Sequence, residues 1–162
     1  MARVYVSLGS NIERSQNVRH ALERLTERYG PLTRSNVYEC EAVGFGSDPF
    51  SNLVVGFDTA ETPRQIQDAL HAIESGSGRL RSGKLAARTL DLDLLLYDDA
   101  VISEDGLVLP REDITRYAFV LRPLAEIAGD ECHPVSGECF SDMWMAFDAD
   151  SQPMRRVDWP PA

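Results

Sequence analysis

The sequence has no apolar run that approaches the roughly 20 residues needed for a membrane-spanning helix, which argues against a membrane partner. Hydrophobic residues still make up 43% of the 162 positions and charged residues 26%, a balance typical of a soluble globular protein. The opening segment, 1–8, is too short and too polar at its end for a signal peptide, and we expect a first β-strand there. We predict a single domain over 1–162, with a loosely ordered tail over about 153–162.

Cysteine is also scarce, with Cys40, Cys132 and Cys139 the three in the chain. Their spacing matches no metal-binding pattern, and an odd number without a secretion signal indicates reduced thiols. We therefore predict a cytoplasmic protein and assign the cysteines no role.

Positive charge is in deficit, because 16 Lys and Arg oppose 26 Asp and Glu to give a formal net charge of −10. Nucleic-acid binding needs concentrated positive charge, so the composition argues against a nucleic-acid partner. The exception is a basic cluster of Arg79, Arg81, Lys84 and Arg88 just before an aspartate-containing strand. Such a cluster beside carboxylates can hold a polyphosphate and its metal, although a solvated basic loop is the alternative.

Apolar spacing predicts an element order of β-α-β-β-α-β. The expected elements are a strand over 4–8, a helix over about 18–29, strands over 32–38 and 53–58 separated by a loop over 42–51, a helix from Thr62-Pro63 to about Ile73, and a strand over 90–97. This order matches an α+β, ferredoxin-like core whose two helices pack on one face of an antiparallel sheet. C-terminal additions follow, with a short strand near 101–102 and a helix over about 119–127.

The most informative residues are Asp91 and Asp93, which stand two positions apart in an otherwise apolar strand. Alternation places both carboxylates on one face and Leu90, Leu92 and Leu94 on the other. Oxygen ligands on a rigid strand suit Mg²⁺, whose coordination shell is completed by water and substrate phosphates. An edge strand with a wet polar face accounts for the two aspartates equally well.

Five motifs occur in one order: Gly-Ser-Asn at 9–11, Phe-Ser-Asn at 50–52, Glu74 with Gly-Arg-Leu-Arg at 78–81, Arg-Thr-Leu-Asp-Leu-Asp at 88–93, and Ala-Phe-Val-Leu-Arg-Pro-Leu at 118–124. Together they resemble the 6-hydroxymethyl-7,8-dihydropterin pyrophosphokinase family of folate biosynthesis, over about residues 3–145. The resemblance implies an enzyme that transfers pyrophosphate from ATP to the hydroxymethyl group of the pterin and releases AMP.

The resemblance also implies roles for individual residues. Asp91 and Asp93 would hold two Mg²⁺ ions, and Arg79 and Arg88 would complete the catalytic set. The implied ATP-binding residues are Glu74, Arg79, Arg81, Lys84, Arg88, Leu94 and Arg111. The implied pterin-binding residues are Val43, Gly44, Phe50, Asn52, Asp91 and Phe119, with the two phenyl rings enclosing a flat heterocycle. The expected partners are these small molecules, and we expect a monomer. For 9–11 we prefer a structural turn over a phosphate-binding loop.

The sequence departs from the family pattern in two places that bear on the acceptor and in two that bear on the phosphates. Residues 85–87 read Leu-Ala-Ala where the family usually has Trp-Gly-Pro, and Cys40 and Glu41 replace a usual Thr-Pro pair. Arg111 stands in place of a histidine, and Tyr117 in place of a basic residue. A paralogue that acts on a related pterin or another small primary alcohol is therefore one alternative, and a non-catalytic nucleotide- or pterin-binding protein is another. A ferredoxin-like RNA-binding module is a third, which the net charge and the absence of the expected sheet-face aromatic motif oppose.

Overall fold

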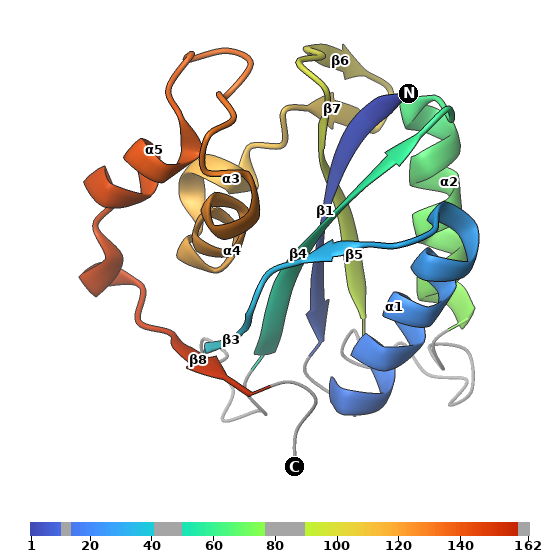
Figure 1. The fold of residues 1–162 in the computed structure, drawn as a ribbon, viewed down its shortest axis with the longest axis horizontal. Helices are drawn as coiled ribbons and strands as arrows, with labels where there is room; N and C mark the ends of the chain where they lie inside the picture. The colour runs from blue at the N-terminus through green and yellow to red at the C-terminus, as the bar shows by residue number, and fades with distance from the viewer. Residues whose placement is uncertain (11–13, 41–49, 77–89, 159–162) are drawn as a thin grey trace.

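Strand β1 (Ala2–Ser10) lies inside an antiparallel six-stranded sheet, in a computed structural model that describes residues 1–10, 14–40, 50–76 and 90–158 (Figure 1). Its neighbours are β4 (Phe50–Thr59) and β5 (Asp91–Tyr97). The strand order is β5-β1-β4-β3-β8, where β3 is Val37–Cys40 and β8 is Arg155–Val157, and β2 (Thr33–Arg34) also pairs with β4. The order β5-β1-β4-β3, with its two crossover helices, confirms the predicted ferredoxin-like core.

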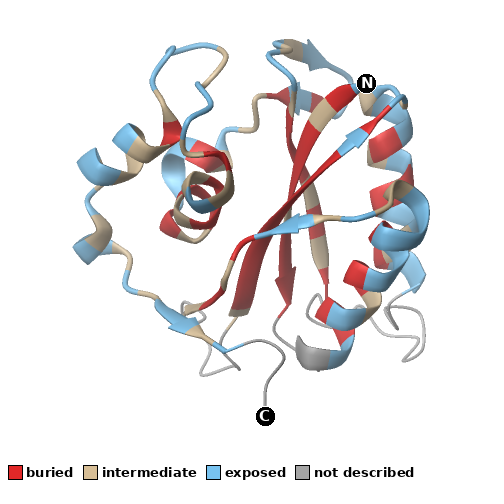
Figure 2. Ribbon diagram, in the orientation of Figure 1, coloured by how far each residue is buried: buried red, intermediate tan, exposed pale blue. Residues whose placement is uncertain are grey.

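Helices cover both faces of this sheet. The crossover helices α1 (Arg14–Tyr29) and α2 (Pro63–Glu74) pack on one face, as expected. The C-terminal helices α3 (Asp113–Arg116), α4 (Ala118–Ala128) and α5 (Phe140–Ala146) pack on the other, as Figures 1 and 2 show. The central strands are therefore buried along most of their length. No helix in the described part of the chain is long and apolar enough to cross a membrane.

A β-bulge in β5 changes which side chains face α4. Tyr5 pairs with Leu96 and Val6 pairs with Leu94, so Leu95 has no partner of its own on β1. The extra residue breaks the alternation, and both Leu95 and Leu96 join the core beneath α4. Asp91 and Asp93 lie before the bulge and share the face of Leu95, which is the face of the C-terminal helices.

Apart from β1, which runs over Ala2–Ser10 rather than 4–8, two strand boundaries differ from the sequence-based prediction. The strand predicted over 32–38 is divided into β2 and β3, because the Ser35 hydroxyl accepts a hydrogen bond from the backbone N–H of Val54 at 2.9 Å. The second difference is that β4 begins at Phe50, within the loop predicted over 42–51. Phe50 and Asn52 therefore belong to the rigid sheet.

The C-terminal part contains more regular structure than predicted. A hairpin of β6 (Ile102–Glu104) and β7 (Leu107–Leu109) replaces the single short strand expected near 101–102. The expected helix is confirmed as α4, whereas α3, α5 and a 3₁₀ turn over Ala149–Ser151 were not predicted. Within the segment 153–162, the three residues of β8 pair with β3.

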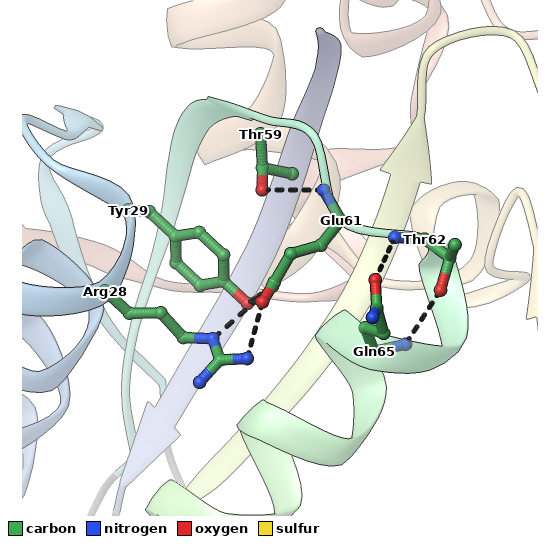
Figure 3. Close-up of polar contacts among 6 residues, drawn as sticks. All are labelled: Arg28, Tyr29, Thr59, Glu61, Thr62 and Gln65. Carbon is green, nitrogen blue, oxygen red and sulfur yellow. Dashed lines mark hydrogen bonds and ion pairs between the residues drawn. The ribbon is translucent and has the colours of Figure 1, made fainter.

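The junction between β4 and α2 is held by a polar cluster that also reaches α1 (Figure 3). Thr62 caps α2 by accepting the Gln65 N–H at 3.2 Å, and the Gln65 side chain accepts the Thr62 N–H at 2.9 Å. The neighbouring Glu61 carboxylate accepts hydrogen bonds from Arg28 and from the Tyr29 hydroxyl, the latter at 2.6 Å. Burial opposes ionisation of Glu61, but these two donors outweigh it and lower the pKa of its carboxyl.

We predict that Glu61→Gln lowers the free energy of unfolding at pH 7 by about 1 kcal/mol, because the charged acceptor of three hydrogen bonds is lost. A lowered carboxyl pKa stabilises the folded state above the usual value of 4.5, and this contribution disappears as the pH falls through the lowered pKa. Urea unfolding at a series of pH values should therefore show the two proteins converging at acidic pH. Glu104→Gln, an exposed change in β6, is the control, and a difference that does not depend on pH would contradict the assignment.

Candidate active site

The register of three strands gathers polar groups at one end of the sheet. Gly9 of β1 pairs with Asn52 of β4 on one side and with Asp91 of β5 on the other. Ser7 lies one row further along and pairs with Asp93. Directly opposite residues project from the same face, so Asn52, Asp91 and Asp93 point to the side of α4.

Gly9 leaves room between the side chains of its two partners. A Cβ atom at this position would lie 3.0 Å from Oδ1 of Asn52, which is tighter than most Cβ contacts and would require the amide to shift. Gly9 and Ser10 are the last residues of β1, so the structure places them in a strand and not in the predicted turn. Asn11 lies outside the described residues.

A cavity of about 330 Å³ lies over this end of the sheet. Its lining combines two partly buried rings, Phe50 and Phe119, with Asn52 and both aspartates. Phe119 is the second residue of α4, and the Tyr117 ring stacks on it with centroids 5.0 Å apart. Apolar walls with a few polar groups are typical of a pocket for a small ligand.

Cys40 contacts the amide in this cavity. Nδ2 of Asn52 donates a hydrogen bond to Cys40 Sγ at 3.3 Å, and Asn52 is only 6% exposed. Burial raises the pKa of the Cys40 thiol despite this hydrogen bond, so the group stays neutral near pH 7. The thiol thus orients the Asn52 amide without adding charge.

A second cavity of about 740 Å³ adjoins the first. Glu74 and Leu94 line it, together with residues of α2 and the β6–β7 hairpin. Asp93 and Arg111 line both cavities. Two ligands bound side by side would therefore meet at these two residues.

Arg111 holds a positive charge at this boundary. Its Nη2 atom lies 3.4 Å from Asp93 Oδ1, and its Nε atom lies 3.3 Å from Asp113 Oδ2. The backbone N–H of Arg111 donates to the Leu95 carbonyl at 3.0 Å, which ties the residue to the bulge of β5. The Arg111 side chain remains 40% exposed, so the guanidinium is accessible from the cavities.

Glu74, the last residue of α2, fixes the outer side of β5. Its Oε2 atom accepts a hydrogen bond from the Leu92 N–H at 2.8 Å, and the residue is only 8% exposed. This bond covers an N–H group on the edge of the sheet, next to both aspartates. Glu74 thus lines the larger cavity and also anchors the strand that carries Asp91 and Asp93.

The structure brings most of the described site residues together. The smaller cavity is lined by Asp91, Asp93, Phe50, Asn52, Phe119 and Arg111. Arg111 also lines the larger cavity, together with Glu74 and Leu94. Six predicted residues lie outside the described residues: Val43, Gly44, Arg79, Arg81, Lys84 and Arg88. The altered segment 85–87 lies outside them as well.

The sequence-based prediction missed Ser7 and Asp113, and it named Cys40 and Tyr117 only as departures from the family. The position of Asp113 two residues after Arg111 is a faint signal, because an aspartate at the start of a helix is common. Ser7 could have been found from strand alternation, since it shares the face of Gly9.

Asp91 and Asp93 are suitable ligands for Mg²⁺. No group of three or more His, Cys, Asp or Glu side chains within the described ranges forms a metal site by itself. Mg²⁺ commonly binds one or two carboxylates and takes its other ligands from water and substrate phosphates. Two same-face aspartates at the wall of a cavity match that requirement.

A family model described as 7,8-dihydro-6-hydroxymethylpterin-pyrophosphokinase (HPPK) matches residues 5–129. The chain belongs to this family. The matched range includes every residue of the site described above.

Individual relatives agree with this assignment. The 2-amino-4-hydroxy-6-hydroxymethyldihydropteridine pyrophosphokinase of Pseudomonas aeruginosa is 40% identical over 133 residues, which cover 79% of this chain and 82% of that protein. The folic acid synthesis protein fol1 of Pneumocystis carinii is 34% identical over 83% of this chain but only 18% of its own length. Wild-type Plasmodium falciparum HPPK-DHPS with SDX-DHP superposes with a TM-score of 0.69 at 16% identity, over 90% of this chain and 43% of that chain. The chain therefore spans less than half of the last two proteins, and the solved structure supports the fold.

Proposed function

We propose that this protein transfers the β,γ-pyrophosphoryl group of ATP to the hydroxymethyl group of 6-hydroxymethyl-7,8-dihydropterin and releases AMP, a reaction of folate biosynthesis. The observation that carries the proposal is the pair of adjoining cavities that share Asp93 and Arg111. Family membership agrees with this activity.

The smaller cavity suits the pterin. A volume of about 330 Å³ admits a small bicyclic molecule, and Phe50 and Phe119 offer aromatic surface to a flat ring. Asn52 offers both a donor and an acceptor to the polar edge of the heterocycle. A hydroxymethyl group directed toward Asp91 and Asp93 would then face the second cavity.

The larger cavity suits the nucleotide. Its lining is mostly polar, and Arg111 at its boundary presents a guanidinium that can bind phosphate oxygens in pairs. Arg79, Arg81, Lys84 and Arg88 remain predicted phosphate contacts from the resemblance. Glu74 remains a predicted nucleotide contact. Its hydrogen bond from the Leu92 N–H holds the carboxylate at the wall of the larger cavity.

In the proposed reaction the alcohol oxygen attacks the β-phosphorus of ATP while the bond to the oxygen bridging the α- and β-phosphorus breaks. AMP leaves with that bridging oxygen, and the proton of the alcohol is lost to solvent. Arg111 stabilises negative charge on the transferred group, because it stands where the two ligands meet. Asp91 and Asp93 would hold Mg²⁺, in our proposal two ions, which supplies positive charge to the phosphates.

The Cys40–Asn52 contact favours a second candidate acceptor. Because Cys40 accepts a hydrogen bond from the Asn52 amide, one N–H of that amide is no longer available to a ligand in the pocket. A related pterin alcohol or another small primary alcohol would then be the substrate of the same transfer. AMP release across a panel of pterin alcohols distinguishes the candidates, and binding of an ATP analogue without turnover on any of them would indicate a non-catalytic protein.

The sequence also predicts a monomer in the cytoplasm, and we retain both as part of the proposal. Size-exclusion chromatography with light scattering tests the first, and fractionation of the source cells tests the second.

Asp91→Asn and Asp93→Asn should each lower AMP production from ATP, Mg²⁺ and the pterin by on the order of 100-fold or more, because each removes an anionic ligand at the point of transfer. Both variants should keep the wild-type circular dichroism spectrum, since the changed side chains lie at a cavity wall. Asp99→Asn, an exposed change in the turn after β5, should leave the rate unchanged. Near wild-type AMP production by either variant, or ADP as the wild-type product, would refute the proposal.

Gly9→Ala should raise the KM for the pterin several-fold and leave the KM for ATP nearly unchanged. The added Cβ would lie 3.0 Å from Asn52 Oδ1, so the amide, which lines the smaller cavity and not the larger one, would have to shift. Steady-state kinetics with each substrate varied in turn measures the two constants. Equal changes in both constants would show that the contact between residue 9 and Asn52 does not act on the pterin site alone.

A further inference from the structure

Two of the three cysteines face each other away from the active site. Cys132 and Cys139 form an isolated antiparallel bridge in the segment that joins α4 to α5. Their sulfur atoms lie 3.8 Å apart as free thiols. Neither residue lines the two cavities of the candidate active site.

The backbone around this pair has the geometry of a cross-strand disulfide site. The His133 N–H donates to the Glu138 carbonyl at 2.8 Å, and the Phe140 N–H donates to the Glu131 carbonyl at 3.0 Å. These bonds flank the cysteines, which therefore form a non-hydrogen-bonded pair with Cα atoms about 4.5 Å apart. Disulfides bridge Cα separations of roughly 4.4–6.8 Å, so side-chain rotation can bring the sulfurs to bonding distance.

Contacts on both sides hold the segment in place. Phe140 is fully buried in the core beneath α4, and Glu131 accepts a hydrogen bond from the Tyr5 hydroxyl of β1. The Ser141 N–H donates to the Gly129 carbonyl at 3.1 Å. The two thiols are thus kept together by the fold.

We propose that Cys132 and Cys139 are a dithiol modification site that a small-molecule disulfide converts to an intramolecular disulfide. The more exposed Cys132 attacks one sulfur of the oxidant and releases one small thiol, forming a mixed disulfide. Cys139 then attacks the Cys132 sulfur and releases the second small thiol. Two protein thiols are oxidised, the oxidant is reduced to two thiols, and these carry the two protons.

The disulfide would stabilise the connection between α4 and α5 without altering the active site. It closes an eight-residue ring, which restricts the unfolded chain more than the folded one. The pair follows the C-terminal end of α4, whereas Phe119 stands at the N-terminal end. The inference therefore does not depend on the proposed function.

The experiment equilibrates the folded protein with oxidised glutathione, quenches it with acid and counts free thiols after unfolding. Wild type should retain one free thiol, Cys40, and its intact mass should show the loss of two hydrogens with no glutathione attached. Peptide mapping should identify the Cys132–Cys139 bond. Oxidation should raise the Tm by about 5 °C in wild type and in the matched control Cys40→Ser, but not in Cys132→Ser or Cys139→Ser.

The proposal would be overturned if both thiols remained reduced, if stable glutathione adducts formed at either cysteine of wild type, or if disulfide-linked dimers formed. A bond that includes Cys40 would overturn it as well. Cys132→Ser should instead trap glutathione on Cys139, or stay reduced, and never form an internal bond.

Discussion

The pairing of β1 with β4 and β5 is the interaction on which the rest of the site depends. In that register Gly9 lies between Asn52 on β4 and Asp91 on β5. The pairing therefore fixes the distance between an amide that can recognise an acceptor and a carboxylate that can hold a metal. A shift of one residue in either pairing would turn these side chains toward α1 and α2 and bury them in an apolar layer. The apolar residues of alternate positions prevent such a shift, because they form the core on that side.

Charge at the site is balanced by parts of the chain that lie far apart in sequence. Asp93 before the β5 bulge and Asp113 at the start of α3 both contact Arg111, whose own N–H is bound to the bulged Leu95. The bulge therefore directs the strand and also positions the cation at the meeting point of two cavities. Glu74 completes the arrangement from the other side of β5 through its bond to Leu92. The aspartates thus stand on a strand anchored at both edges, which would suit the proposed binding of metal and phosphate in fixed geometry.

The parts that could be predicted are those with strong local signals. Thr62, Pro63 and Gln65 mark the start of α2, and the aspartate strand follows from simple alternation up to Leu94. Long-range features were not predictable in this way, because they depend on pairing partners that local spacing does not show. Ser35 divides a strand through its bond to Val54, and β8 forms by pairing with the edge of β3. The Arg111–Asp113 contact and the Cys132–Cys139 pair likewise arise from turns that bring short segments together.

The central claim is that Asp91 and Asp93 hold metal and phosphate where the two cavities meet. The most direct test is a crystal structure with Mg²⁺, the pterin and an ATP analogue whose bridge between the α- and β-phosphorus is a methylene group, which the proposed reaction cannot cleave. The account predicts metal bound to both aspartates, the pterin ring between Phe50 and Phe119, and the Arg111 guanidinium on a phosphate oxygen. Metal bound elsewhere, or a nucleotide that does not reach Asp93, would contradict it.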